Sequence, residues 1–238
     1  MKNLVFAALL LGGLSQATGC IISSDDSSSD GSFLVSWDLQ TRLAASPGAI
    51  SCADAGVTTI RTTSQPVAGG MIVDLFDCSV GVDETAPLPQ TDYTVWVDAL
   101  DSADALVAES FSQDASIFDT NPVGVDFSFP VDIGYFGLTW TLTRDGVQET
   151  CADEGGDGLE ILSTPVNGGG TGFDEIFDCS DGSATTTSDL PLDDYTVSIT
   201  LIDANDQPLN NPENKSTSLD YGNQLNDLGN FEFDFTQP

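Results

Sequence analysis

The chain contains no histidine and only five lysine or arginine residues, against 38 aspartates and glutamates, so its formal net charge is −33. Without histidine, neither a Ser-His-Asp nor a Cys-His catalytic arrangement can form. A surface of this charge repels phosphate groups, so we expect no binding to DNA or RNA. Such a surface would attract cations or basic proteins instead. Its self-repulsion also favours solubility.

The sequence also lacks an apolar segment of membrane-spanning length. The apolar run from Leu4 to Leu14 follows Met1-Lys2-Asn3 and is too short to cross a bilayer, but it has the length of a signal-peptide core. Small residues then lead to Gly19-Cys20. This stretch resembles the lipobox of bacterial lipoproteins, although Ala17 stands where that family usually has leucine. The resemblance implies a signal peptide over residues 1–19 and a lipid anchor on Cys20.

The segment that follows Cys20 is rich in serine and aspartate. Its composition predicts a tether over residues 20–32, with a reach of about 20 Å. No aspartate directly follows Cys20, which by resemblance to the sorting rule of enteric bacteria implies the outer membrane, on its periplasmic or its surface face. The partners implied are therefore a membrane, through the lipid, and an unknown protein or polysaccharide.

The rest of the chain is a tandem duplication. Phe76-Asp77-Cys78 recurs as Phe177-Asp178-Cys179, and Asp92-Tyr93-Thr94-Val95 recurs as Asp194-Tyr195-Thr196-Val197. The two tryptophans Trp37 and Trp140 are 103 residues apart, an offset close to that of the other matching pairs. A repeat of this length predicts two domains, which we place at residues 33–130 and 131–238.

Within each repeat, apolar residues alternate with polar ones and no helical period is sustained. This period of two predicts strands, and the Gly- and Pro-containing segments between them predict turns. The expected strands, paired by repeat, are 33–39 with 136–142, 57–62 with 159–163, 70–76 with 172–177, 92–100 with 194–202, and 125–129 with 231–235. The expected fold class is all-β: two tandem antiparallel β-sandwiches.

Three stretches of the chain resemble strands of fibronectin type III and related immunoglobulin-like domains. Residues 34–38 look like the second strand of that fold, where a tryptophan fills the core, and residues 88–97 and 190–199 look like its tyrosine-corner strand. The resemblance implies immunoglobulin-like sandwiches with Trp37, Tyr93, Trp140 and Tyr195 as structural core residues. The sequence departs from the family in two ways: its Leu-to-Tyr spacing is one residue shorter than the common form, and fibronectin type III domains usually lack a disulfide.

Four of the five cysteines fall in the repeats, which leaves Cys20 for lipidation. Four cysteines allow three pairings, and the duplication selects Cys52–Cys78 and Cys151–Cys179. We expect structural disulfides, because an exported chain meets oxidising conditions. A zinc site is the alternative, but the chain has no Cys-x-x-Cys spacing and no histidine.

Two features suggest binding chemistry. The acidic turns around Asp101 and Asp104, and around Asp203 and Asp206, are weak calcium candidates, although turn geometry alone favours Asp at such positions. No other metal or cofactor is expected. Trp96 should point outward from its strand, where Ser198 is its counterpart, so it could stack on a sugar, anchor a partner or pack the two domains together.

No catalytic constellation emerges, so we expect a protein that is not an enzyme. A carboxylate pair of the glycosidase type stays open only because acidic residues are so many. Arg42 and Arg144, which follow the two tryptophans, are expected to form local ion pairs. The first hypothesis is an envelope lipoprotein whose domains serve in binding, adhesion or envelope structure. The second is a carbohydrate- or calcium-dependent binding accessory, and the third is a hydrolase.

Overall fold

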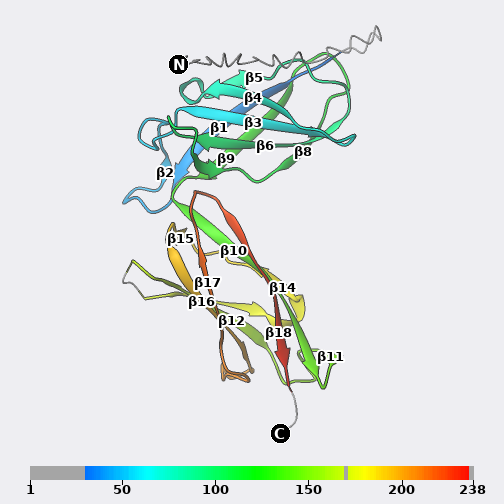
Figure 1. Cartoon of the computed structure of the whole chain (residues 1–238), viewed down its shortest axis with the longest axis vertical. Helices are drawn as coiled ribbons and strands as arrows, with labels where there is room; N and C mark the ends of the chain where they lie inside the picture. The colour runs from blue at the N-terminus through cyan, green and yellow to red at the C-terminus, as the bar shows by residue number, and fades with distance from the viewer. Residues whose placement is uncertain (1–29, 169–170, 236–238) are drawn as a thin grey trace, which may run out of the picture.

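The computed structural model describes residues 30–168 and 171–235, and the signal peptide, Cys20 and most of the expected tether lie outside these residues. The described chain is built of strands, with two short 3₁₀ helices. It forms two immunoglobulin-like β-sandwiches that lie end to end along the long axis (Figure 1). The predicted fold class is confirmed.

The first sandwich consists of two sheets packed face to face. In one, β1 (Phe33–Thr41) pairs with β2 (Gly48–Ala49), β5 (Val82–Glu84) and β9 (Val123–Pro130). The other has the order β4 (Ile72–Asp77), β3 (Thr59–Pro66), β6 (Asp92–Leu100) and β7 (Leu106–Glu109), with β8 (Gln113–Ser116) also on β6. The 3₁₀ helix η1 (Cys78–Val80) carries the chain from one sheet to the other.

The second sandwich repeats this plan. Its first sheet has β10 (Ile133–Arg144) at the centre, beside β11 (Val147–Glu149), β14 (Ser183–Thr185), β15 (Leu190–Pro191) and β18 (Leu225–Asp234). Its second sheet has the order β13 (Phe173–Asp178), β12 (Gly158–Pro165), β16 (Asp194–Ile202) and β17 (Glu213–Ser218), and η2 (Cys179–Asp181) follows β13.

The first and last strands of each sandwich lie side by side and run in the same direction. β1 pairs in parallel with β9 from Phe33–Val123 to Gln40–Pro130, and β10 pairs in parallel with β18. The strand of Trp37, which resembles a second strand in sequence, is therefore the first strand of the described domain and neighbours its last. The other strand pairs within both sandwiches are antiparallel.

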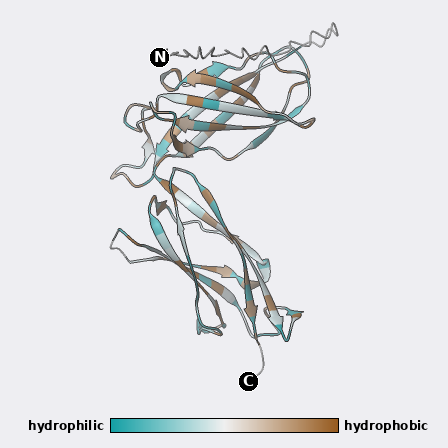
Figure 2. Cartoon of the chain, in the orientation of Figure 1, coloured by the Kyte–Doolittle hydropathy of each residue, from teal (hydrophilic) through white to brown (hydrophobic). Residues whose placement is uncertain are grey.

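The alternating sequence pattern produces the two cores. Along β1, Phe33, Val35, Trp37 and Leu39 are all buried, and the matching residues Phe136, Leu138, Trp140 and Leu142 are buried along β10. Hydrophobic and hydrophilic colours accordingly alternate along the central strands (Figure 2). Each repeat has its own cluster of buried apolar residues, drawn from residues 33–129 in the first and 136–233 in the second.

The two sandwiches are joined by more than the chain. The loop before β18 forms a parallel bridge with β7, in which Gly222 N donates to Val107 O at 2.8 Å and Glu109 N donates to Gly222 O at 3.1 Å. Asn223 adds a side-chain hydrogen bond to Glu109 O at 2.8 Å. A Cβ atom on Gly222 would lie 2.4 Å from Val131 Cα, so this close approach requires glycine.

Candidate functional site

Each sandwich contains a tyrosine corner of the kind that the sequence suggested. Tyr93 Oη donates to Pro89 O at 2.7 Å, and Tyr195 Oη donates to Pro191 O at the same distance. Both rings lie in the cores, where they meet Phe33 and Phe136 edge to face. Burial raises the pKa of both hydroxyls, that of Tyr195 to about 12. These residues stabilise the fold and are not available to a ligand.

The two predicted disulfides form, and each lies beneath a tryptophan. Cys52 bonds to Cys78 and Cys151 to Cys179. The indole N–H of Trp37 donates to Cys78 O at 2.9 Å, and that of Trp140 donates to Cys179 O at 2.9 Å. The indole therefore ties the start of the 3₁₀ helix to the central strand of the opposite sheet, and the disulfide ties the same point to the turn that carries Cys52 or Cys151.

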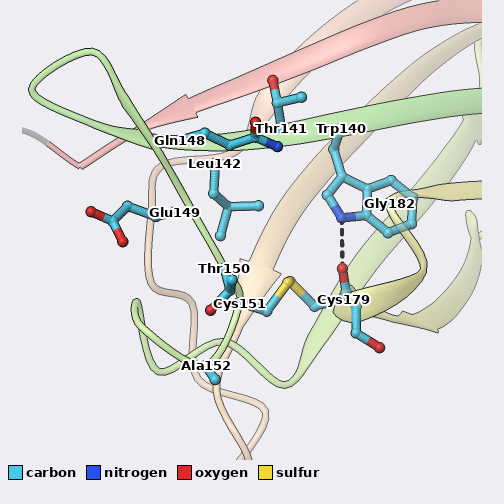
Figure 3. A pocket seen from close by; sticks show the side chains of 11 residues that line it. Trp140, Thr141, Leu142, Gln148, Glu149, Thr150, Cys151, Ala152, Cys179 and Gly182 are labelled. Carbon is cyan, nitrogen blue, oxygen red and sulfur yellow. Dashed lines mark hydrogen bonds between the residues drawn. A yellow bond between two sulfur atoms is a disulfide. The ribbon is translucent and has the colours of Figure 1, made fainter.

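A shallow cleft opens beside each disulfide, with a volume of about 340 Å³ in the second domain and about 330 Å³ in the first. In the second domain Leu142 points toward the Cys151–Cys179 disulfide, and Gln148 and Glu149 lie along one wall (Figure 3). Because the cleft recurs at matching positions of both repeats, it follows from the fold and does not distinguish one domain as a binding unit.

The outer face of the β4–β3–β6 sheet, by contrast, differs between the repeats. In the first domain Val73 and Trp96 flank Thr63 across the strands, and Leu75 lies opposite Arg61. Val73 is 51% exposed and Leu75 is 64% exposed, whereas Trp96 is partly buried. We call Val73, Leu75 and Trp96 the outer strip.

An ion pair lies beside Leu75, at one end of the outer strip. Arg61 donates to the buried carboxylate of Asp98 at 2.7 Å. Glu109 lies opposite Asp98 in the register of β7, where burial, followed by the charge of Asp98, raises the pKa of Glu109 while Arg61 opposes the shift. The carboxylate of Asp98 is thus held by Arg61 and is not presented to a ligand.

The matching face of the second domain carries different chemistry. Asp174 stands where the first domain has Val73, Ser198 stands in place of Trp96, and Glu160 stands in place of Arg61. Ile176, 56% exposed, is the counterpart of Leu75, and Leu162, 38% exposed, stands in place of the buried Thr63. The outer face of the second domain therefore keeps exposed aliphatic side chains, but it has no tryptophan and carries a carboxylate in place of Val73.

The four aspartates suggested for calcium serve their own turns. Asp101 Oδ1 accepts from the backbone N–H groups of Ala103 and Ala105, and Asp203 Oδ1 accepts from those of Asn205 and Gln207. The bonds from Gln207 and Asn205 lower the pKa of Asp203. Asp104 and Asp206 occupy the left-handed position of the same turns. Within residues 30–168 and 171–235, no three His, Cys, Asp or Glu side chains converge as metal ligands would.

The two arginines after the tryptophans behave differently from each other. Arg144 pairs with Glu154 at 2.5 Å, as expected. Arg42 was expected to do the same, but the structure shows no carboxylate within ion-pair distance of its guanidinium in the described chain. Its backbone N–H instead donates to Asp132, whose side chain also binds Thr41 and Leu43. Asp132 thus fixes the turn at the junction of the domains.

The structure does not describe the predicted lipid anchor. Cys20 lies outside the described residues, so its lipidation stays a prediction. Over the part of the chain that the structure describes, no helix has the length and apolar content needed to cross a bilayer.

Sequence comparison finds no match to a protein-family model or to a curated protein. Several solved structures are similar in fold. The Bacillus anthracis TIE protein matches at a TM-score of 0.28 and 14% identity, over 86% of this chain and 34% of that protein. A segment of two fibronectin type III domains from chicken tenascin matches at a TM-score of 0.23 and 15% identity, over 68% of this chain and 83% of the segment.

The minor pilin GBS52 of Streptococcus agalactiae matches at a TM-score of 0.28 and 8% identity, over 86% of this chain and 94% of the pilin. The chain spans about a third of the length of the Bacillus anthracis protein.

Proposed function

We propose that this chain is a non-enzymatic, lipid-anchored protein of the bacterial envelope that binds a protein partner through the outer strip of its first domain. The observation that carries the proposal is the difference between the repeats. Both copies keep the same core, disulfide and tyrosine corner and expose aliphatic side chains on this face, but only the first places a tryptophan, Trp96, among them, with Val73 where the second has Asp174.

Folding does not require Val73 and Trp96 on this face. The second domain forms the same sheet with Asp174 and Ser198 at the matching positions. Apolar side chains in contact with water bring no stabilisation to the free protein, and contiguous ones mark sites of association. Tryptophan is moreover enriched among the residues that dominate the affinity of protein interfaces.

The surroundings of the outer strip favour a protein over a polysaccharide. A sugar site combines an exposed aromatic ring with polar side chains that bind hydroxyl groups. Here the ring of Trp96 is partly covered, its exposed neighbours are aliphatic, and Arg61 holds the nearest carboxylate. The net charge of −33 implies that the partner is neutral or basic around its contact surface.

A photo-crosslinking experiment in the native envelope tests this proposal. A photoreactive phenylalanine analogue replaces Leu75, and in a matched control it replaces Ile176. We expect a discrete protein adduct from position 75 only, and its loss when Val73→Asp and Trp96→Ser introduce the residues of the second domain. Equal adducts at both positions, or an adduct that survives the double substitution, would contradict a site on the outer strip.

The same variants separate the carbohydrate alternative. Affinity electrophoresis in gels containing envelope polysaccharide should show equal retardation for the wild type and Trp96→Ala. Retardation that depends on Trp96 would support the polysaccharide partner instead.

The anchor requires its own test, because Cys20 lies outside the described residues. Metabolic labelling with a tagged fatty acid should mark the wild type but not Cys20→Ser, and membrane fractionation should place the labelled protein in the outer membrane. Protease treatment of intact cells then distinguishes the surface face from the periplasmic face. Incorporation of label into both proteins, or into neither, would contradict the anchor.

A further inference from the structure

Several loops come together at the end of the first sandwich where the chain enters it, next to the start of β1. Gly31 forms a bridge with Leu88, and its N–H donates to Leu88 O at 2.9 Å. Ile117 N donates to Thr91 O at 3.0 Å, and Val67 N donates to Asp92 O at 3.1 Å. Residues 66–71 and 117–122 therefore lie at the same end as Gly31, and we call them the proximal loops.

The proximal loops present large apolar side chains to solvent. Val67 is 78% exposed, Phe118 is 78% exposed and Met71 is 67% exposed. Phe118 is also close to the incoming chain, since a Cβ atom on Gly31 would lie 2.4 Å from Ile117 Cγ2 and 2.5 Å from Asp119 O. The second domain lies beyond the opposite end of this sandwich (Figure 1).

The second domain shows what the same end does when it has a neighbour. There Leu219 N donates to Asp193 O as Ile117 N donates to Thr91 O, so Asp220 is the counterpart of Phe118. The loop that follows, with Gly222 and Asn223, docks on β7 of the first domain. This end of the fold therefore faces whatever precedes it in the chain: the first domain in one copy, and the anchored N-terminus in the other.

The chain that precedes the first domain is short. Eleven residues run from Cys20 to Asp30. They span no more than about 40 Å even when fully extended. A lipid on Cys20 consequently keeps the proximal loops near the bilayer surface, which raises their local concentration there.

We propose that Val67, Met71 and Phe118 insert into the interfacial region of the lipid bilayer that holds the acyl chains of Cys20. This inference rests on the proposed lipid anchor. Phenylalanine, methionine and valine bury apolar surface at such an interface without needing polar partners. Together with the lipid on Cys20, this insertion fixes the orientation of the first sandwich on the membrane. The second domain then points away from the membrane, and the outer strip stays exposed to solvent near the membrane surface.

Charge limits which lipids suit this contact. Asp92 and Asp119 are exposed at the same end, where Asp92 accepts from Ser116 and Asp119 accepts from the N–H of Asn121. Their carboxylates repel anionic headgroups. The insertion is therefore specific for a zwitterionic surface, and it weakens as the fraction of anionic lipid rises.

Fluorescence quenching by brominated lipid tests the contact in the full-length, acylated protein. Phe118→Trp places a reporter in a proximal loop, and Val166→Trp places a matched reporter in the corresponding hairpin of the second domain, where Val166 is 61% exposed. Both are reconstituted in phosphatidylcholine vesicles with bromine on the acyl chains, and the wild type gives the signal of the native tryptophans. We expect added quenching at position 118 only, which declines when phosphatidylglycerol is included.

The outcomes distinguish this inference from the anchor on which it rests. Protein that floats with the vesicles but shows no added quenching at position 118 overturns the insertion and leaves the anchor standing. Protein that does not float overturns both. Hydrogen exchange on the unsubstituted protein gives a check without mutation: vesicles should slow exchange in residues 66–71 and 117–122, and unchanged exchange there would also overturn the proposal.

Discussion

Tyr195 Oη lies 2.7 Å from the carbonyl oxygen of Pro191, four residues earlier in the chain, and donates a hydrogen bond to it. The ring is fully buried and meets Phe136 edge to face, with 5.4 Å between ring centroids. One residue therefore joins the corner before β16 to the core beneath it. Tyr93 does the same before β6, so both copies keep this lock.

Removal of one hydroxyl should destabilise its domain at neutral pH. Tyr195→Phe leaves the ring in place but leaves Pro191 O without its donor, which we expect to cost about 1 kcal/mol in the free energy of unfolding. Urea denaturation measures this loss, and Tyr93→Phe should give a similar one. Unchanged stability in both variants would show that water replaces the hydroxyl at no cost.

The same tyrosine predicts a loss of stability in strong alkali. The pKa of Tyr195 is about 12 in the folded protein, against 10.0 for a free tyrosine, because burial disfavours the charged form. The unfolded chain therefore loses its proton at lower pH than the folded chain, and the free energy of unfolding falls as pH rises from about 10 to about 12. Tyr195→Phe should flatten this decline, and tyrosinate absorbance should show a group that titrates late.

Each disulfide should stabilise only its own domain. Cys52 and Cys78 are 26 residues apart, and Cys151 and Cys179 are 28 apart. Closure of such a loop lowers the conformational entropy of the unfolded chain, which adds about 3.5 kcal/mol to the free energy of unfolding. Replacement of Cys52 and Cys78 by alanine should accelerate hydrogen exchange in residues 33–130 far more than in the second domain. Non-reducing peptide mapping that recovered a bridge between the two domains would contradict the assigned pairing.

Gly222 should determine the angle between the domains. Its Cβ position lies 2.4 Å from Val131 Cα and 2.5 Å from Val131 C, so Gly222→Val forces the loop away from β7. We expect loss of the bridge to β7 and a broader distribution of interdomain distances in small-angle X-ray scattering, with both cores intact. Gly124→Val is the control, because its Cβ position has no neighbour within 4 Å. Equal scattering from both variants would mean that the bridge does not restrain the domains.

Calcium should leave the melting temperature unchanged. A ligand at a hundred times its dissociation constant adds about 2.7 kcal/mol to stability, but Asp101 and Asp203 already accept backbone hydrogen bonds within their turns. Asp203→Ala should lower stability with or without calcium, since it removes the acceptor for Asn205 N and Gln207 N. A rise in Tm with calcium that this substitution abolished would restore the cation site.

The sequence predicts the parts of the fold that depend on a buried face. Phe33, Val35, Trp37 and Leu39 alternate strictly, so β1 could be recognised from its pattern. The strands that the pattern did not predict are short or lack such a face. β17 (Glu213–Ser218) carries Lys215 and mostly polar side chains along a sheet edge. β7 and β8 are four residues long, and β2, β5, β11, β14 and β15 are only two or three. Their pairing is set by the strands beside them.

The candidate site is predictable only in part, for a similar reason. The outward direction of Trp96 follows from the buried Tyr93, Val95 and Val97 on the same strand. β4, however, has apolar residues on both faces, with Ile72 and Phe76 inward and Val73 and Leu75 outward, so its register with β3 was needed to place the outer strip. The bridge between Ala108 and Gly222 joins residues far apart in the chain, so no local sequence pattern predicts it.

The parallel pairing of terminal strands has a mechanical consequence. A pull that enters at the N-terminal end of β1 and leaves at the C-terminal end of β9 slides the two strands past each other, because they run in the same direction. Their eight paired positions, from Phe33–Val123 to Gln40–Pro130, are then loaded together in shear instead of opening one at a time. β10 and β18 repeat this arrangement. Tension between a fixed N-terminus and a load at the C-terminal end of β18 would meet this resistance twice.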